Sequence, residues 1–349
     1  MSQPPSGHRQ TSLEERASKF DTGAPVTGAV AIGATLASSF GDGTVRFFDP
    51  SKSAPAEVHA HSGVVLCCVA DEDHLLTGGD DGRFLRIAPD GTVSELANFE
   101  SRWVDCVAAK DGISVCSSGS SVYIWSNDHI EPTILKHSST VGGLAFDKKG
   151  KRLAVAHYGG TTIWEKSDRR WKSKKLIWKG FHGAVTFSPD GKYVITAMQE
   201  NALHGWRIRD KADLAMTGYP AKVKSFSWVG DTPHLVTSGA DEAICWPFDG
   251  KDGPMGRPPV CVANGGKQIS THVHALQEEK AVIAGFRDGS VLLAEIVENK
   301  EPIVLKGSSG NEITAIALTS GLSHILIGDS KGNILWTTLW AGETNVKSI

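Results

Sequence analysis

The chain of 349 residues contains 36 basic and 39 acidic residues, a net charge of −3, and is 40% hydrophobic. These values are typical of an ordinary folded protein and exclude a disordered or highly charged chain. They also argue against a nucleic-acid-binding protein, because the one basic cluster, residues 168–179, is interpreted as a loop between two strands.

The chain is expected to form one domain over residues 15–340, after a flexible segment at 1–14 and before a C-terminal tail at 341–349. No signal-peptide-like apolar region begins it, and no run of about 18 apolar residues occurs. We therefore expect a cytoplasmic protein without a membrane partner. The cysteines lie in apolar runs without CxxC spacing, which predicts buried, reduced thiols at Cys67, Cys68, Cys106, Cys116, Cys245 and Cys261.

A unit of three short apolar stretches, separated by polar turns, recurs along the chain. Its middle portions occupy residues 35–49, 74–88, 112–126, 152–165, 193–207, 234–247, 281–295 and 324–338. The third stretch closes, at intervals of 38 to 48 residues, with Phe48, Ile87, Trp125, Trp164, Trp206, Trp246, Ala294 and Trp336. This regularity predicts eight copies of one structural unit.

Each unit is predicted to consist of strands. Tight hairpin turns are indicated by Asp42-Gly43, Asp81-Gly82 and Asp288-Gly289, because Asp and Gly tolerate the positive φ that such turns need. The apolar runs are rich in Val, Ile and Leu on both faces, as expected if each small sheet lies between two others. No helical stripe of useful length occurs after about residue 20, so the fold class is all-β.

The repeat, with FSPDGKYVITA at 187–197 and GDGTVRFFD at 41–49, resembles the WD40 repeat. The resemblance implies a β-propeller of four-stranded blades around a central channel, with eight blades favoured and seven as the alternative. The last copy lacks its outer strand. Residues 15–20 are expected to supply that strand and thereby close the ring.

A WD40 unit is expected to carry a hydrogen-bonded set of His, Ser or Thr, Asp and Trp. The second unit offers His61, Thr77 and Asp81, but no unit contains the complete set. In the fifth unit Trp178 occupies the expected His position and Glu200 that of the turn Asp. The departures affect the details of single blades and leave the predicted architecture unchanged.

Residues 196–206 allow two interpretations. In a helix Glu200 and His204 would lie one turn apart, close enough to act as acid and base. In a strand they would lie roughly 13 Å apart. The repeat predicts strand, turn and strand here, which removes the acid–base couple and leaves His204 to pack or hydrogen-bond between blades.

Metal binding and catalysis find little support in the motifs. Two His-x-His pairs could each place two imidazoles on one strand face, as half of a zinc site: His59 with His61 and His272 with His274. Neither pair has a third ligand nearby, so we expect structural histidines and no metal or cofactor. Ser308, in GSSGN, matches a nucleophile elbow only in part and is interpreted as a loop residue.

If the four strands of a blade are lettered a to d in chain order, the resemblance implies that partners bind at the end of the ring that carries the d–a loops between blades and the b–c turns within them. We therefore expect a non-catalytic, monomeric platform for a protein or peptide partner, with no nucleic acid. The alternatives are an enzyme or small-molecule binder using the central channel and, more weakly, a metal binder. The residues predicted for the partner-binding face are Arg102, His157, Tyr158, His182, Gln199, Glu200, Lys222, Phe286 and Arg287.

Overall fold

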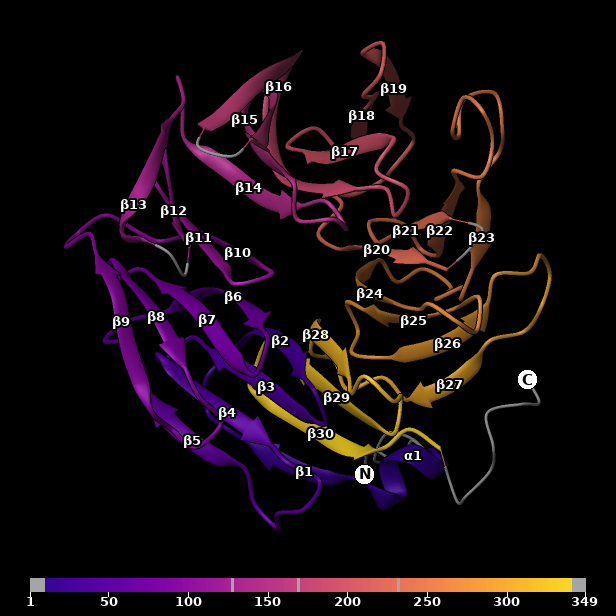
Figure 1. Ribbon diagram of the computed structural model, residues 1–349. Coiled ribbons are helices and arrows are strands. Elements are labelled where there is room, and N and C mark those ends of the chain that lie inside the picture. Colours follow the sequence, from indigo (N-terminus) through magenta and orange to yellow (C-terminus); the bar gives the residue numbers. More distant parts are fainter. Residues whose placement is uncertain (1–9, 127–128, 168–169, 231–232, 341–349) are drawn as a thin grey trace.

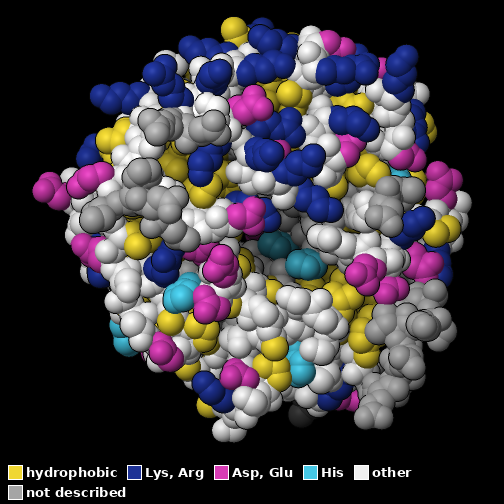
Figure 2. Space-filling model, in the orientation of Figure 1, with side chains coloured by type: hydrophobic (Ala, Val, Ile, Leu, Met, Phe, Trp, Pro, Cys, Tyr) yellow, Lys and Arg dark blue, Asp and Glu magenta, His cyan; other side chains and the backbone are white. Residues whose placement is uncertain are grey.

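The computed structural model describes residues 10–126, 129–167, 170–230 and 233–340. Antiparallel sheets stand around a common centre, which is the arrangement of a β-propeller (Figure 1). The centre is hollowed, and histidine side chains lie within it (Figure 2). No helix in the described ranges is long and apolar enough to cross a membrane.

Consecutive strands form each sheet in chain order. Three four-stranded sheets come first, built from β2 (Val26–Ile32), β3 (Thr35–Phe40), β4 (Thr44–Phe48) and β5 (Ala56–His59), then β6 (Val65–Asp71), β7 (His74–Gly79), β8 (Arg83–Ile87) and β9 (Val93–Asn98), then β10 (Cys106–Lys110), β11 (Ile113–Ser118), β12 (Ser121–Ser126) and β13 (His129–Lys136). A six-stranded sheet follows, with β14 (Val141–Phe146), β15 (Arg152–Ser167), β16 (Arg170–Phe187), β17 (Tyr193–Met198), β18 (Leu203–Arg207) and β19 (Ala212–Met216).

Three more four-stranded sheets complete the ring. They contain β20 (Phe226–Val229), β21 (His234–Thr237), β22 (Ala243–Pro247) and β23 (Val260–Val262), then β24 (Ser270–Leu276), β25 (Ala281–Phe286), β26 (Val291–Glu295) and β27 (Ile303–Lys306), then β28 (Ile313–Leu318), β29 (His324–Asp329), β30 (Asn333–Thr338) and β1 (Ser18–Asp21). In Figure 1 the first and last sheets lie side by side, and β2 contacts β28.

The described residues form seven hydrogen-bonded sheets, and not the eight separate sheets favoured from the sequence. Two predicted units share the six-stranded sheet, because β15 pairs with both β14 and β16, and β16 also pairs with β17. The turn expected at 157–160 has no Asp and lies inside the span of β15, where the pairing with β16 shifts register between Tyr158 and Gly160.

The N-terminal residues lie against the last strand. β1 pairs antiparallel with β30, from Ser18 opposite Trp336 to Asp21 opposite Asn333. Before it, the short helix α1 (Ser12–Arg16) is capped by Thr11 and buries Leu13 in the core. The boundary expected between residues 14 and 15 therefore falls inside a helix. The expected segments 1–9 and 341–349 lie outside the described residues.

The core lies between neighbouring sheets. β11, β17 and β25 are buried at every position, as expected of strands covered on both faces. The Asp-Gly turns have the predicted conformation, with φ of +85° at Gly43 and +79° at Gly82. A Cβ on Gly82 would lie 2.1 Å from the carbonyl oxygen of Glu100, so the following loop packs directly on this turn.

Candidate binding face

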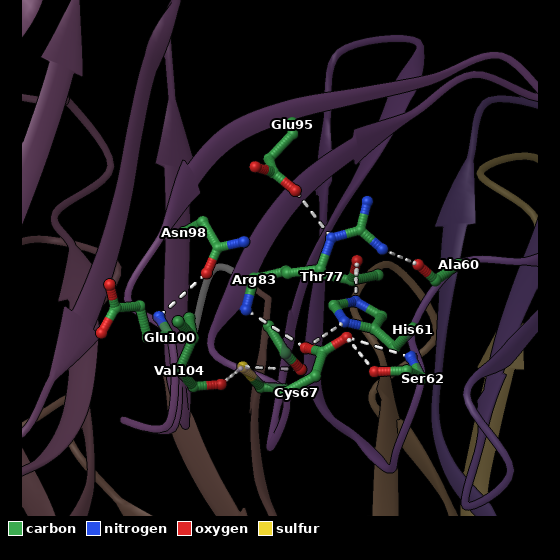
Figure 3. Close-up of polar contacts among 12 residues, drawn as sticks. Ala60, His61, Ser62, Cys67, Thr77, Arg83, Glu95, Asn98, Glu100 and Val104 are labelled. Carbon is green, nitrogen blue, oxygen red and sulfur yellow. Dashed lines mark hydrogen bonds and ion pairs between the residues drawn. The ribbon is translucent and has the colours of Figure 1, made fainter.

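The second sheet contains a hydrogen-bonded set built on His61 (Figure 3). Its Nδ1–H donates to Asp81 Oδ1 at 2.9 Å, because a carboxylate only accepts, and its Nε2 accepts from the Thr77 hydroxyl at 2.9 Å. Burial lowers the pKa of His61, which keeps the ring neutral near pH 7. Asp81 also accepts from the backbone N–H groups of Ser62 and Arg83. The set ties the loop before β6 to the β7–β8 turn.

His182 has the corresponding role in the fifth unit, where the sequence pointed to Trp178. Its Nε2–H donates to the Trp178 carbonyl at 3.2 Å, and its Nδ1 accepts from the Thr196 hydroxyl at 2.7 Å. The side chain is 0% exposed. The prediction that His182 contacts a partner is therefore wrong. Phe286 is wrong for the same reason, because it is fully buried in the core.

A tyrosine replaces the histidine in the sixth unit. Tyr219 shares a hydrogen bond of 2.7 Å with Thr237 and accepts another of 2.6 Å from Trp246 Nε1. Sequence reasoning missed this residue. The signal was its spacing, since it precedes Thr237 by 18 residues, as His61 precedes Thr77 by 16. The feature that recurs is therefore a hydrogen-bonding ring side chain before the first strand of the unit, and this side chain can be histidine or tyrosine.

A hollow of about 420 Å³ opens where the β15 turn and the β17–β18 turn meet. We call it the aromatic hollow; its lining includes Tyr158, Trp178, Lys179, Met198, Glu200, Leu203 and His204. Tyr158 is 62% exposed and Trp178 is 37% exposed, although both are large apolar side chains. Lys179 and Glu200 are exposed and place opposite charges at the rim. The combination can bind an apolar side chain flanked by charged groups.

The floor of the aromatic hollow is closely packed. Trp178 stacks on His204 with ring centroids 3.9 Å apart, and His204 packs edge-on against Trp206 at 4.7 Å. Burial, and then the neighbouring His182, lowers the pKa of His204 to about 4. The neutral ring is thus a packing group, and its buried Nε2 has no hydrogen-bond partner among the described residues. Strand geometry separates it from Glu200 as predicted, although both line the hollow.

The other predicted face residues are distributed around the ring. Four of them are exposed in loops outside the aromatic hollow: Arg102, Gln199, Lys222 and Arg287. His157 is half-buried and bonds the Thr162 hydroxyl at 2.9 Å, so it supports the turn below Tyr158. The exposed apolar side chains that sequence reasoning did not select include Trp103, Ile177 and Trp178. The sequence feature that could have identified them is an aromatic or apolar residue outside the apolar pattern of the strands.

The structure also places the residues considered for metal binding and catalysis, and the cysteines. His59 is exposed beside Glu57 while His61 is buried, so this pair does not share a face. No group of three His, Cys, Asp or Glu side chains in the described ranges could hold a metal. Ser308 donates its hydroxyl to the Asp288 carbonyl. All six cysteines are free, but Cys261 is exposed, which corrects the expectation that every thiol is buried.

Comparisons with known proteins agree with this geometry. No family model matches the sequence. The human angio-associated migratory cell protein, a WD40-repeat protein, is 25% identical over 208 residues, which are 58% of this chain and 46% of that protein. The 66 kDa stress protein of Physarum polycephalum is 23% identical over 55% of this chain and 33% of that protein. The chain thus spans half or less of the curated relatives it matches.

A crystal structure of the computationally designed Ika8 protein matches the fold with a TM-score of 0.72 and 16% identity, over 91% of this chain and 98% of the other. At this identity the likeness concerns the fold alone. The chain is a β-propeller whose sequence is similar, at 25% identity, to that of a WD40-repeat protein.

The buried histidines should make the stability of this propeller depend on pH. Burial lowers the pKa of His137, His204 and His272 to about 4, against 6.5 for an ordinary histidine. As pH falls from about 6.5 to 4, the unfolded chain gains protons that the folded protein does not bind, so stability falls in this window. Melting temperatures across it should decrease, and His204→Phe should reduce the decrease.

The exposed His59 supplies the control for this experiment. His59→Gln should leave the wild-type pH dependence unchanged. Equal melting temperatures at pH 6.5 and pH 4.5 would contradict the assignment of neutral buried rings.

Proposed function

We propose that the WD40-like propeller is a non-catalytic, monomeric, cytoplasmic platform that binds a protein or peptide partner at the end carrying the d–a and b–c loops. The aromatic hollow is the observation that carries this proposal. Exposed Tyr and Trp side chains with charged neighbours are the residue types that dominate binding energy in protein interfaces. The WD40-like relatives support a partner-binding role in general terms.

The partner would bind a preformed surface, without a conformational change in the propeller. Tyr158 and Trp178 offer two aromatic surfaces for an apolar side chain of the partner, while Lys179 and Glu200 can pair with charges beside it. His182 holds the backbone of Trp178 from below through its hydrogen bond to the carbonyl. A surface that is already rigid loses little conformational entropy on binding, which favours affinity.

We also infer that the six-stranded sheet corresponds to two repeat units, which would make eight blades closed by β1. Lys166 N–H donates to the Lys151 carbonyl at 2.9 Å, although fifteen extended residues would span about 50 Å. The chain therefore reverses within β15. The register shift between His182 and Ala184 in β16 also recurs at the start of β2, β6, β14, β24 and β28.

Affinity purification from the native cell tests the proposed face. The wild-type protein is compared with a variant that carries Arg102→Ala, Tyr158→Ala and Arg287→Ala, three exposed positions of the loop end. Loss of a partner from the variant supports the proposal. A partner that binds both proteins equally would exclude this face. Ile303→Ala, on the exposed outer strand β27, is the control that should retain the partner.

A further inference from the structure

Positive charge is concentrated in one part of the chain. Residues 147–192 contain twelve Lys or Arg against four Asp or Glu, a net charge of +8, whereas the whole chain has −3. Lys and Arg side chains accordingly gather over the part of the molecule where Figure 1 places β14 to β19 (Figure 2). The basic cluster noted at 168–179 is thus one edge of a larger basic surface.

The lysine-bearing loops at 147–152 and 188–192 lie at the end of the ring opposite the aromatic hollow, whereas Lys179, also in this range, lines that hollow. Successive turns of an antiparallel sheet alternate between its two ends. The loops at 188–192 and 208–211 flank β17 and β18 on the side away from the 199–202 turn that carries Glu200. Lys192 and Arg209 therefore belong to a second face, separate from the proposed partner site.

A second hollow, of about 300 Å³, lies in this face. Its charged lining side chains are all basic: Arg152, Lys192, Arg207, Arg209 and Lys251. Carboxylates pair with four of these five groups and hold them in place. Arg152 Nε lies 2.8 Å from Asp147 and Arg207 Nη2 lies 2.9 Å from Asp210, while the remaining pairs are Arg207 with Asp252, Arg209 with Asp210 and Lys192 with Asp190.

The excess positive charge comes from lysines around the hollow. Those that are exposed and have no ion-pair partner among the described residues include Lys148, Lys149, Lys151, Lys166, Lys172 and Lys251. We call these lysines and the lining of the second hollow the basic face. Clustered like charges without counter-charges raise the local concentration of an oppositely charged ligand.

We propose that the basic face binds a short acidic segment of a protein, rich in Asp and Glu. A long nucleic acid fits less well, because it would extend past the basic residues onto a remainder of the chain whose net charge is −11, the difference between −3 and +8. The aromatic side chain in the second hollow, Tyr193, is buried and offers no surface for stacking a base. A short acidic peptide needs only carboxylate-to-lysine contacts within the basic face.

Fluorescence anisotropy with a labelled short polyglutamate peptide and the full-length protein tests this proposal. The basic-face variant carries Lys148→Glu, Lys151→Glu and Lys251→Glu. It should bind the peptide at least about tenfold more weakly than the wild type, and high salt should weaken wild-type binding. The matched control reverses three exposed lysines on other sheets, Lys136→Glu, Lys267→Glu and Lys331→Glu, and should change the affinity by less than about twofold.

Two outcomes would overturn the proposal. Equal weakening in the basic-face variant and the control would show that the peptide responds to net charge and not to this site. A short DNA duplex of equal charge that binds more tightly than the peptide, and is lost in the same variant, would assign the face to nucleic acid. Glutamine at the same three positions should give an intermediate affinity, and unchanged melting temperatures would show that the variants fold.

Discussion

Replacing Tyr158 and Trp178 together by alanine should weaken partner binding about a hundredfold or more. Aromatic residues at the centre of an interface each contribute about 2 kcal/mol or more, and 1.4 kcal/mol corresponds to a tenfold change in affinity. Both side chains line the aromatic hollow and are substantially exposed without a partner. The dissociation constant of the partner, measured by titration calorimetry, gives the effect directly.

The controls separate binding from folding. Trp178→Phe keeps a ring over His204 and should retain most of the affinity. Ile303→Ala removes an exposed apolar side chain from β27, away from the loops, and should have no effect. If the double variant keeps wild-type affinity, the aromatic hollow is not the binding site.

Replacing Trp206 by alanine should lower the free energy of unfolding by about 3 to 5 kcal/mol, the usual cost of removing a large buried aromatic side chain. Trp206 is 2% exposed and lies in the core beneath the aromatic hollow, against His182 and His204. Its removal leaves a cavity that these rings cannot fill, since they are held by their own contacts. Urea unfolding monitored by circular dichroism measures the change.

Trp103 provides a matched control, because it is the same residue type but 59% exposed. Trp103→Ala should change the free energy of unfolding by less than about 0.5 kcal/mol. Similar losses in the two variants would mean that Trp206 does not pack as described.

The repeat made the fold predictable, and its limits explain the errors. Period, Asp-Gly turns and apolar runs are local features, so they predicted the strands and the propeller correctly. The sheet count was harder, because it depends on hydrogen bonds formed across residues 157–160 and 181–182, which the local sequence does not determine even where Gly159 and Gly160 mark a turn. His182 was assigned to the partner-binding face for a similar reason. Strand β16 forms the outer strand of one predicted unit and continues as the first strand of the next, and the sequence does not show where one ends and the other begins.

The candidate site was predictable only in part. Tyr158 and Glu200 were selected because they lie in b–c turns, and both line the aromatic hollow. Trp178 was assigned a structural role. Its stacking on His204 could not be predicted, because it joins residues 26 positions apart and depends on side-chain packing. Neither periodicity nor motif spacing carries that information. The same holds for the basic face, whose side chains lie in or beside five separate connections between strands, those after β14, β15, β16, β18 and β22.

Hydrogen exchange of the propeller with and without its purified partner tests the central claim most directly. If the loop end is the binding face, amides at 157–160, 178–182 and 199–202 should exchange more slowly in the complex, while those of the outer strand β27 should not change. Protection confined to outer strands, or to the opposite end of the ring, would contradict the account.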